Sequence, residues 1–120
     1  MDRAALGRRG EDAVAALLRE RGFAILGRNV RVGRLELDLI ARRRDLLVVC
    51  EVRARTSTAF GPPVETIGPE KVRRVRQATA RWLATEGRDL GRVRLRFDAA
   101  GVLLNRAGEV TSLDYYEDAF

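Results

Sequence analysis

The amino-acid sequence predicts a three-layer α/β or α+β domain whose elements follow the order α-β-β-β-α-β-β. Two observations carry this prediction. Two segments repeat apolar residues at a spacing of three and four, which is typical of helices. Five others are short and apolar, or alternate apolar with polar side chains, which is typical of strands. We expect one domain, 1–120, because 120 residues is an ordinary domain length.

The chain begins with a predicted helix. Residues 6–18 carry its apolar stripe, and Gly22 is suited to end it because glycine tolerates the left-handed conformation that follows many helices. Residues 23–26 then form a short predicted strand, and Asn29 and Gly33 mark the connection onward.

A predicted hairpin follows, with strands 35–41 and 46–52 joined by a tight turn at 43–45. Leucines occupy the odd positions of the first strand, whereas the more apolar face of the second lies at even positions. Placing both apolar faces on the core fixes the parity of the pairing, because a slip of one residue would move every side chain to the other face. This parity places four charged residues together on the opposite face: Glu36, Asp38, Glu51 and Arg53.

The second half of the chain supplies the remaining elements. Residues 56–68 form a predicted loop, and a helix is predicted from Pro69 to Gly87. Residues 93–104 form a strand with a bulge expected at Gly101, and 110–116 form the last strand. Within the helix and the first of these strands, arginines gather on one side, as at Arg92, Arg94 and Arg96.

The chain is strongly basic. It has 23 Lys and Arg against 17 Asp and Glu, which gives a net charge of +6. Such a balance favours a polyanionic partner, nucleic acid before membrane. A basic but merely solvated surface explains the composition equally well, so charge alone leaves the two interpretations level.

Composition excludes several chemistries. The sequence contains no histidine, which rules out histidine-based acid–base catalysis and histidine-ligated zinc. Its single cysteine, Cys50, cannot form an internal disulfide, which fits a reducing compartment. No segment has the apolar length of a membrane span, and residues 1–8 lack the apolar core of a signal peptide. We therefore expect a cytoplasmic protein without membrane contact.

The carboxylates of the predicted hairpin allow two interpretations. Carboxylates on neighbouring strands can hold Mg²⁺, which accepts one or two of them and fills its octahedron with water and substrate phosphate. Alternatively, Glu36, Asp38 and Glu51 are surface residues paired with nearby arginines, an arrangement that contributes only about 0–1 kcal/mol per pair. Spacing alone favours the surface interpretation.

A resemblance shifts this balance. The sequence contains, in order, Gly10-Glu11, residues 35–41 (LELDLIA), residues 49–55 (VCEVRAR), residues 60–65 (FGPPVE), Lys71, Arg96-Phe97-Asp98 and a terminal Ala119-Phe120. Together these motifs resemble those of the YraN-like family of bacterial endonuclease-like proteins, and they extend over nearly the whole chain. The resemblance implies the restriction-endonuclease-like PD-(D/E)XK fold, here a three-layer α/β domain with a central mixed sheet, distantly similar to Holliday-junction resolvases.

The same resemblance implies an Mg²⁺- or Mn²⁺-dependent endonuclease that hydrolyses phosphodiester bonds of DNA, with branched DNA among the candidate substrates. Asp38 and Glu51 would be the metal ligands, Glu11 an outer or water-orienting carboxylate, and Glu36 a supporting one. Arg53 stands where the family has lysine. Unlike lysine, a guanidinium cannot give up its proton in a protein, although it can hold a phosphate and stabilise developing charge.

Further residues are candidates for contacts with nucleic acid: Arg55, Lys71, Arg74, Arg94 and Arg96. Lys71 is the only lysine in the chain, so its position reflects chemistry, a phosphate contact or chance. Because of Arg53, the alternative to an enzyme is a catalytically impaired nucleic-acid-binding module or accessory subunit. A homodimer is an expectation by analogy with resolvases. Trp82 and Cys50 are predicted to lie in the core.

Overall fold

The computed structural model describes residues 2–56 and 67–120. Its helices are α1 (Arg3–Glu20), α2 (Pro69–Ala84) and the short 3₁₀ helix η2 (Arg88–Leu90). Its strands are β1 (Ala24–Val32), β2 (Leu35–Arg43), β3 (Leu46–Arg55), β4 (Arg94–Leu104) and β5 (Val110–Tyr116). The predicted order is confirmed, with η2 as an addition.

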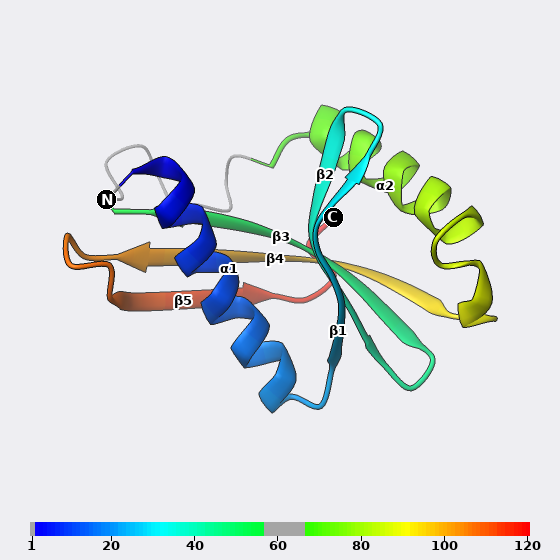
Figure 1. Cartoon of the computed structure of the whole chain (residues 1–120), viewed down its shortest axis with the longest axis horizontal. Coiled ribbons are helices and arrows are strands. Elements are labelled where there is room, and N and C mark those ends of the chain that lie inside the picture. Colours follow the sequence, from blue (N-terminus) through cyan, green and yellow to red (C-terminus); the bar gives the residue numbers. More distant parts are fainter. Residues whose placement is uncertain (1, 57–66) are drawn as a thin grey trace.

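The five strands form one mixed sheet in the order β1-β2-β3-β4-β5. Strands β3 and β4 pair in parallel, and every other neighbouring pair is antiparallel. Helix α1 packs on one face of the sheet, and α2, which connects the two parallel strands, packs on the other (Figure 1). The predicted three-layer α/β class is therefore confirmed, and the arrangement is compatible with the restriction-endonuclease-like fold.

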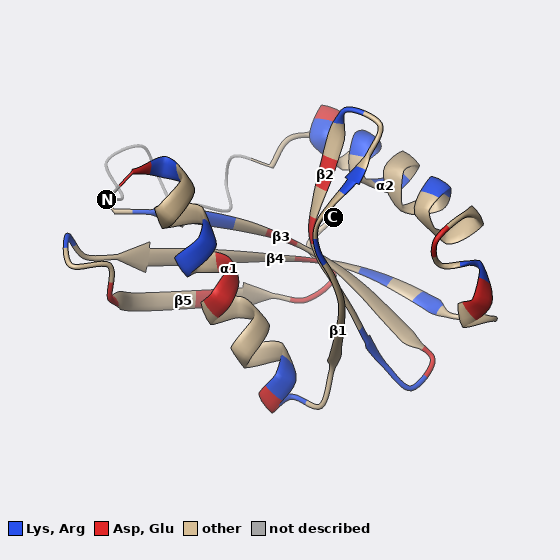
Figure 2. Ribbon diagram, in the orientation of Figure 1, with Lys and Arg blue, Asp and Glu red and all other residues tan. Residues whose placement is uncertain are grey.

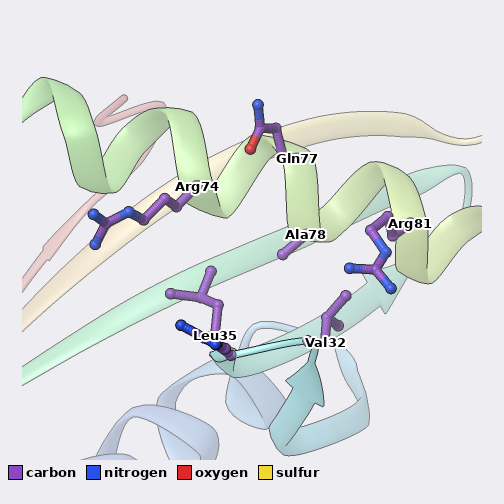
Figure 3. Close-up of a pocket in the computed structure, with 8 residues that line it drawn as sticks. Val32, Leu35, Arg74, Gln77, Ala78 and Arg81 are labelled. Carbon is purple, nitrogen blue, oxygen red and sulfur yellow. The ribbon is translucent and has the colours of Figure 1, made fainter.

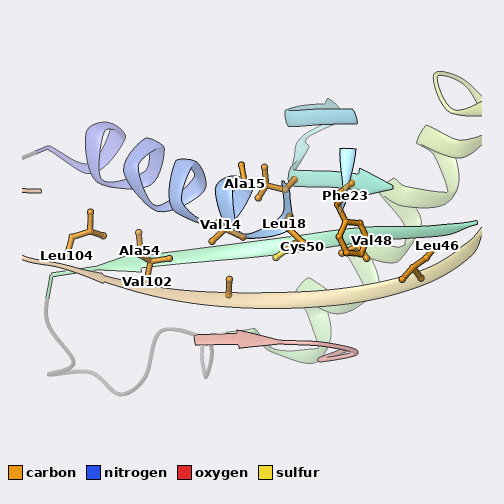
Figure 4. Packing of buried hydrophobic residues seen from close by; sticks show 13 residues of the cluster. Val14, Ala15, Leu18, Phe23, Leu46, Val48, Cys50, Ala54, Val102 and Leu104 are labelled. Carbon is orange, nitrogen blue, oxygen red and sulfur yellow. The ribbon is translucent and has the colours of Figure 1, made fainter. Parts of the chain in front are cut away.

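Apolar side chains fill the space on both faces of the sheet. Under α1, Val14 and Leu18 pack against Val48, Cys50 and neighbouring residues (Figure 4). Under α2, the second cluster comprises Leu37, Ile40, Leu47, Val49, Val75, Ala78, Trp82 and Phe97. Successive residues of a strand point to opposite faces, so β3 is buried on both sides from Leu46 to Glu51. The predicted core positions of Trp82 and Cys50 are confirmed.

Local sequence explains the position of α1. The Asp2 carboxylate accepts a hydrogen bond from the Ala5 amide, 2.7 Å away, and caps the helix. At the other end, Gly22 has φ of +89°, and the amides of Gly22 and Phe23 donate to carbonyls of the last turn. Gly22 thus ends the helix as predicted. In the middle, a Cβ at Gly10 would lie 2.8 Å from the Ala54 Cβ, so glycine allows α1 to approach β3 closely.

The first strand differs from its prediction. Strand β1 continues to Val32 and includes Asn29, which was expected to mark a connection. Asn29 adopts φ of +51°, a conformation that asparagine tolerates better than most residues, so the strand passes through this position without ending. Its pairing with β2 shifts register between Ile25 and Gly27.

The faces of β2 also differ in part from the prediction. Leu39 pairs with Cys50, and both side chains lie under α1, as the predicted parity requires. Leu37 was expected on the same face, but it packs under α2. The reason is the twist of the β1–β2 ribbon, which leaves the main sheet and passes beside α2 (Figure 1).

Three boundaries in the second half differ as well. Gly101 pairs regularly with Arg53 and Asp114, and the register shift lies between Leu103 and Leu104 instead. Helix α2 ends at Ala84, before Gly87, where a Cβ would lie 2.7 Å from the Trp82 ring. Close packing against the Trp82 ring therefore requires glycine at position 87. Arg92 lies outside β4. Of the predicted loop 56–68, residues 57–66 lie outside the described residues.

Candidate functional site

The candidate site lies where β2 separates from β3. The pairing of these strands extends from Arg43 opposite Leu46 to Leu39 opposite Cys50. At the next position, side-chain carboxylates accept the hydrogen bonds of the backbone amides in place of the opposite strand's carbonyls. The Val52 amide donates to Asp38 Oδ2 at 2.8 Å, and the Asp38 amide donates to Glu51 Oε2 at 3.4 Å. The two carboxylates therefore occupy the opening between the strands.

Glu51 is almost completely buried, with 2% of its side chain exposed. Its Oε1 lies 3.2 Å from the ammonium of Lys71, which belongs to the first turn of α2 and is 29% exposed. Burial and the charge of Asp38 raise the pKa of Glu51, Lys71 lowers it, and the net result is a pKa of about 7. The ion pair with Lys71 thus stabilises the ionised form of Glu51, whereas burial and the charge of Asp38 favour the protonated form.

Asp38 and Glu11 complete the acidic part of the site. Burial raises the pKa of Asp38, and burial likewise raises the pKa of Glu11, to which the nearby Asp38 charge contributes. The Asn29 amide group donates to Glu11 Oε1 at 2.9 Å and so orients this carboxylate toward β1. From the sequence, Asn29 was expected only to mark a connection between strands, with no part in the site. Its left-handed backbone conformation is visible only in the structure.

Glu36 differs from these three acids. Its side chain is 46% exposed and lies 3.9 Å from Arg31, which is 70% exposed. The surface-pair interpretation therefore describes Glu36, although its charge still acts on Asp38 and Glu11. The same interpretation fails for Glu51, which is buried.

Arg53 follows Glu51 by two residues on β3, and its positive charge lowers the pKa of Asp38. Among the described residues, its Nε is a buried donor without a hydrogen-bond partner. An unpartnered buried donor is costly, by about 1–3 kcal/mol, and native proteins seldom retain one without a reason. A phosphate oxygen at this place would satisfy it.

The other predicted nucleic-acid contacts lie in several places. Arg55 is exposed at the end of β3, and Arg74 lies one turn after Lys71 on α2, where Glu70 is 3.3 Å away. Arg94 pairs with Asp45 at 3.0 Å. It lies opposite Leu46, five residues from the level of Glu51, which corresponds to about 16 Å along the strand.

Arg96 takes part in a buried network. It donates to both carboxylate oxygens of Asp98, which is completely buried and also accepts hydrogen bonds from the Tyr115 hydroxyl and the Asp118 amide. These contacts tie β4 to the C-terminal segment. The structure therefore brings together Glu11, Asp38, Glu51, Arg53 and Lys71, with Glu36 at the margin. It does not bring Arg94 and Arg96 to the carboxylates.

The carboxylates fit a divalent cation of the Mg²⁺ type. Asp38 and Glu51 provide hard oxygen ligands, and among residues 2–56 and 67–120 no cluster of three or more potential ligands is arranged around one point. Mg²⁺ commonly uses one or two protein carboxylates and keeps several waters, so two ligands suffice. In this structure the Lys71 ammonium neutralises Glu51.

The elements around this point differ in charge. Acidic positions lie midway along α1 and on β2, each of which also carries arginines, whereas α2 carries mainly basic residues (Figure 2).

Comparison with known proteins identifies a family: the model of the uncharacterised protein family UPF0102 matches residues 10–102. The chain belongs to the UPF0102 family. The YraN-like resemblance of the motifs is thereby confirmed.

Relatives within UPF0102 match over most of their length. A UPF0102 protein of Sorangium cellulosum is 46% identical over 110 residues, which cover 91% of this chain and 76% of the relative. One from Leifsonia xyli is 46% identical over 98 residues, covering 82% and 81%. One from Dictyoglomus turgidum is 35% identical over 120 residues and covers both chains completely.

Two expectations about surroundings have different outcomes. Neither of the long helices found in the described part of the chain has the apolar length needed to cross a bilayer. The homodimer and the cytoplasmic location stay predictions.

Proposed function

We propose that this UPF0102 protein binds DNA and hydrolyses its phosphodiester bonds with Mg²⁺ or Mn²⁺ held by Asp38 and Glu51. One observation carries the proposal: two carboxylates with raised pKa values occupy the gap between two strands, with the Lys71 ammonium 3.2 Å from one of them. Shifted pKa values beside a specific charge partner are a feature of functional sites.

The bound cation would polarise the phosphodiester and lower the pKa of an attacking water. The chain's own residues have distinct parts. Asp38 and Glu51 bind the cation, and Asn29 fixes Glu11 where it can orient water. Arg53 donates to a phosphate oxygen from its Nε–H, which has no partner among the described residues, and Lys71 stabilises the negative charge that develops on the phosphoryl group.

The position of Lys71 bears on the alternative function. The family lysine is replaced by Arg53, which cannot carry a proton and would favour a module that binds without cleaving. Lys71 nevertheless places an ammonium 3.2 Å from Glu51 Oε1, from a different element of the fold. This contact favours the enzyme.

The test is an Mg²⁺ and Mn²⁺ titration with branched, flapped and linear DNA. We expect cleavage that EDTA abolishes and that Asp38→Asn reduces by at least about 100-fold, because loss of a metal ligand removes several kcal/mol of transition-state stabilisation. Glu109→Gln, which removes an exposed carboxylate from the β4–β5 turn, is the matched control and should leave the rate unchanged. Binding without cleavage on every substrate would establish the binding module instead.

A further inference from the structure

A pocket of about 460 Å³ lies between α2 and the tip of the β1–β2 ribbon. Its lining residues are Val32, Gly33, Arg34, Leu35, Arg74, Gln77, Ala78 and Arg81. Val32, Leu35 and Ala78 form an apolar floor, Arg81 points from α2 toward the ribbon, and Arg74 extends along α2 at the edge of the pocket (Figure 3). Arg34 adds a third guanidinium from the turn of the ribbon.

The charge of this pocket is only partly neutralised. Arg74 lies 3.3 Å from Glu70, with both side chains more than half exposed. Within the described part of the chain, neither Arg34 nor Arg81 has a carboxylate within ion-pair distance. Three guanidiniums around an apolar floor match a phosphate-bearing ligand, because each can bind two oxygens of a phosphate at once.

Helix α2 connects this pocket to the carboxylate site. Lys71, Arg74 and Arg81 follow one another at intervals of three and seven residues, which places them along one side of the helix. From Lys71 to Arg81 the helix rises about 15 Å, at about 1.5 Å per residue. A DNA strand carries a phosphate about every 3.4 Å along the duplex axis, so this length corresponds to about four nucleotide steps.

We propose that the Arg34–Arg74–Arg81 pocket binds the sugar–phosphate backbone of a DNA strand about one to four nucleotides from the phosphodiester that is cleaved at the carboxylate site. This inference rests on the proposed function for its choice of DNA. It assigns binding to Arg34 and Arg81 in addition to the predicted contacts. The pocket fixes the strand, and the carboxylate site acts on it.

Binding in EDTA tests the pocket separately from cleavage. The double variant Arg34→Ala/Arg81→Ala removes two exposed guanidiniums, and Arg19→Ala/Arg106→Ala, on α1 and the β4–β5 turn, removes the same charge elsewhere. Loss of two phosphate contacts should lower the log–log salt slope by about 1.8, which corresponds to about 60-fold weaker binding at 0.1 M salt. The control variant should bind within about threefold of the wild type, since diffuse charge is screened beyond about 10 Å at this salt.

Equal losses of DNA affinity in the two variants would overturn the pocket proposal, because the overall positive charge of the protein would then explain binding. An affinity for inorganic phosphate or a mononucleotide equal to that for DNA would also overturn it, in favour of a small ligand. Oligonucleotides shorter than about four nucleotides should lose the difference between wild type and pocket variant. If the pocket variant loses DNA affinity but no protein shows metal-dependent cleavage, hydrolysis is refuted and the pocket proposal stands. If the wild type cleaves DNA but the pocket variant keeps its full DNA affinity, the pocket proposal is refuted and hydrolysis stands.

Discussion

Replacement of Lys71 by methionine removes the ammonium that faces Glu51 and keeps most of the side-chain volume. Removing one partner of a buried ion pair commonly costs about 3–5 kcal/mol. Because Lys71 is 29% exposed, solvent screens part of this interaction, and we expect a loss of about 2 kcal/mol in the free energy of unfolding at pH 8.5.

The loss should depend on pH. The folded-state pKa of Glu51 is about 7, above the unfolded value of about 4.5, so folding favours the protonated acid. The stability contributed by this group is fully present below pH 4.5 and is lost as the pH rises through 7. At pH 5 Glu51 is largely neutral in the folded protein, and the Lys71→Met variant should then differ little from the wild type.

Urea unfolding of both proteins at pH 5 and pH 8.5 measures this difference. Arg73→Met is the matched control, because Arg73 lies on the same helix but pairs with Glu70 in solvent, and its loss should cost less than about 0.5 kcal/mol at either pH. In a Glu51→Gln background, Lys71→Met should lose its pH dependence. Equal destabilisation at both pH values, or a pH dependence that survives Glu51→Gln, would refute this account of the ion pair.

Two further substitutions test other parts of the site. Arg53→Lys should raise Mg²⁺-dependent cleavage, because lysine places a compact ammonium beside the attacking water, whereas a guanidinium cannot give up its proton. Single-turnover kinetics would show this, and a fall in rate would mean that the guanidinium is better suited to the reaction. Gly10→Ala should destabilise the protein by about 1–3 kcal/mol, since the new Cβ would lie 2.8 Å from that of Ala54 and force α1 away from β3. Thermal unfolding measures this loss, and Gly7→Ala, where the added Cβ has no neighbour within 4 Å, provides the control that should not lose stability.

Local patterns in the sequence were sufficient for the elements and their order. The boundaries of β5, the end of α1 at Gly22 and the parity that pairs Leu39 with Cys50 follow from alternation, from glycine and from the burial of apolar side chains. These features depend on residues close together in the chain. The composition likewise excluded histidine chemistry without any structure. Alternation placed Glu36, Asp38 and Glu51 on one face, whereas only the resemblance to the YraN-like family singled out Asp38 and Glu51 as ligands.

Tertiary structure decided what surrounds those carboxylates. Twist of the β1–β2 ribbon moved Leu37 to the α2 side and opened the space between β2 and β3, an effect of packing that no local pattern contains. Lys71 lies 20 residues after Glu51 in sequence, yet α2 places its ammonium 3.2 Å from that carboxylate. Asp45 and Asp98 neutralise Arg94 and Arg96, which alternation had presented as one basic face. Sequence determines which charges the chain carries, whereas packing determines which are buried together, because Coulomb interaction and desolvation depend on distance through space.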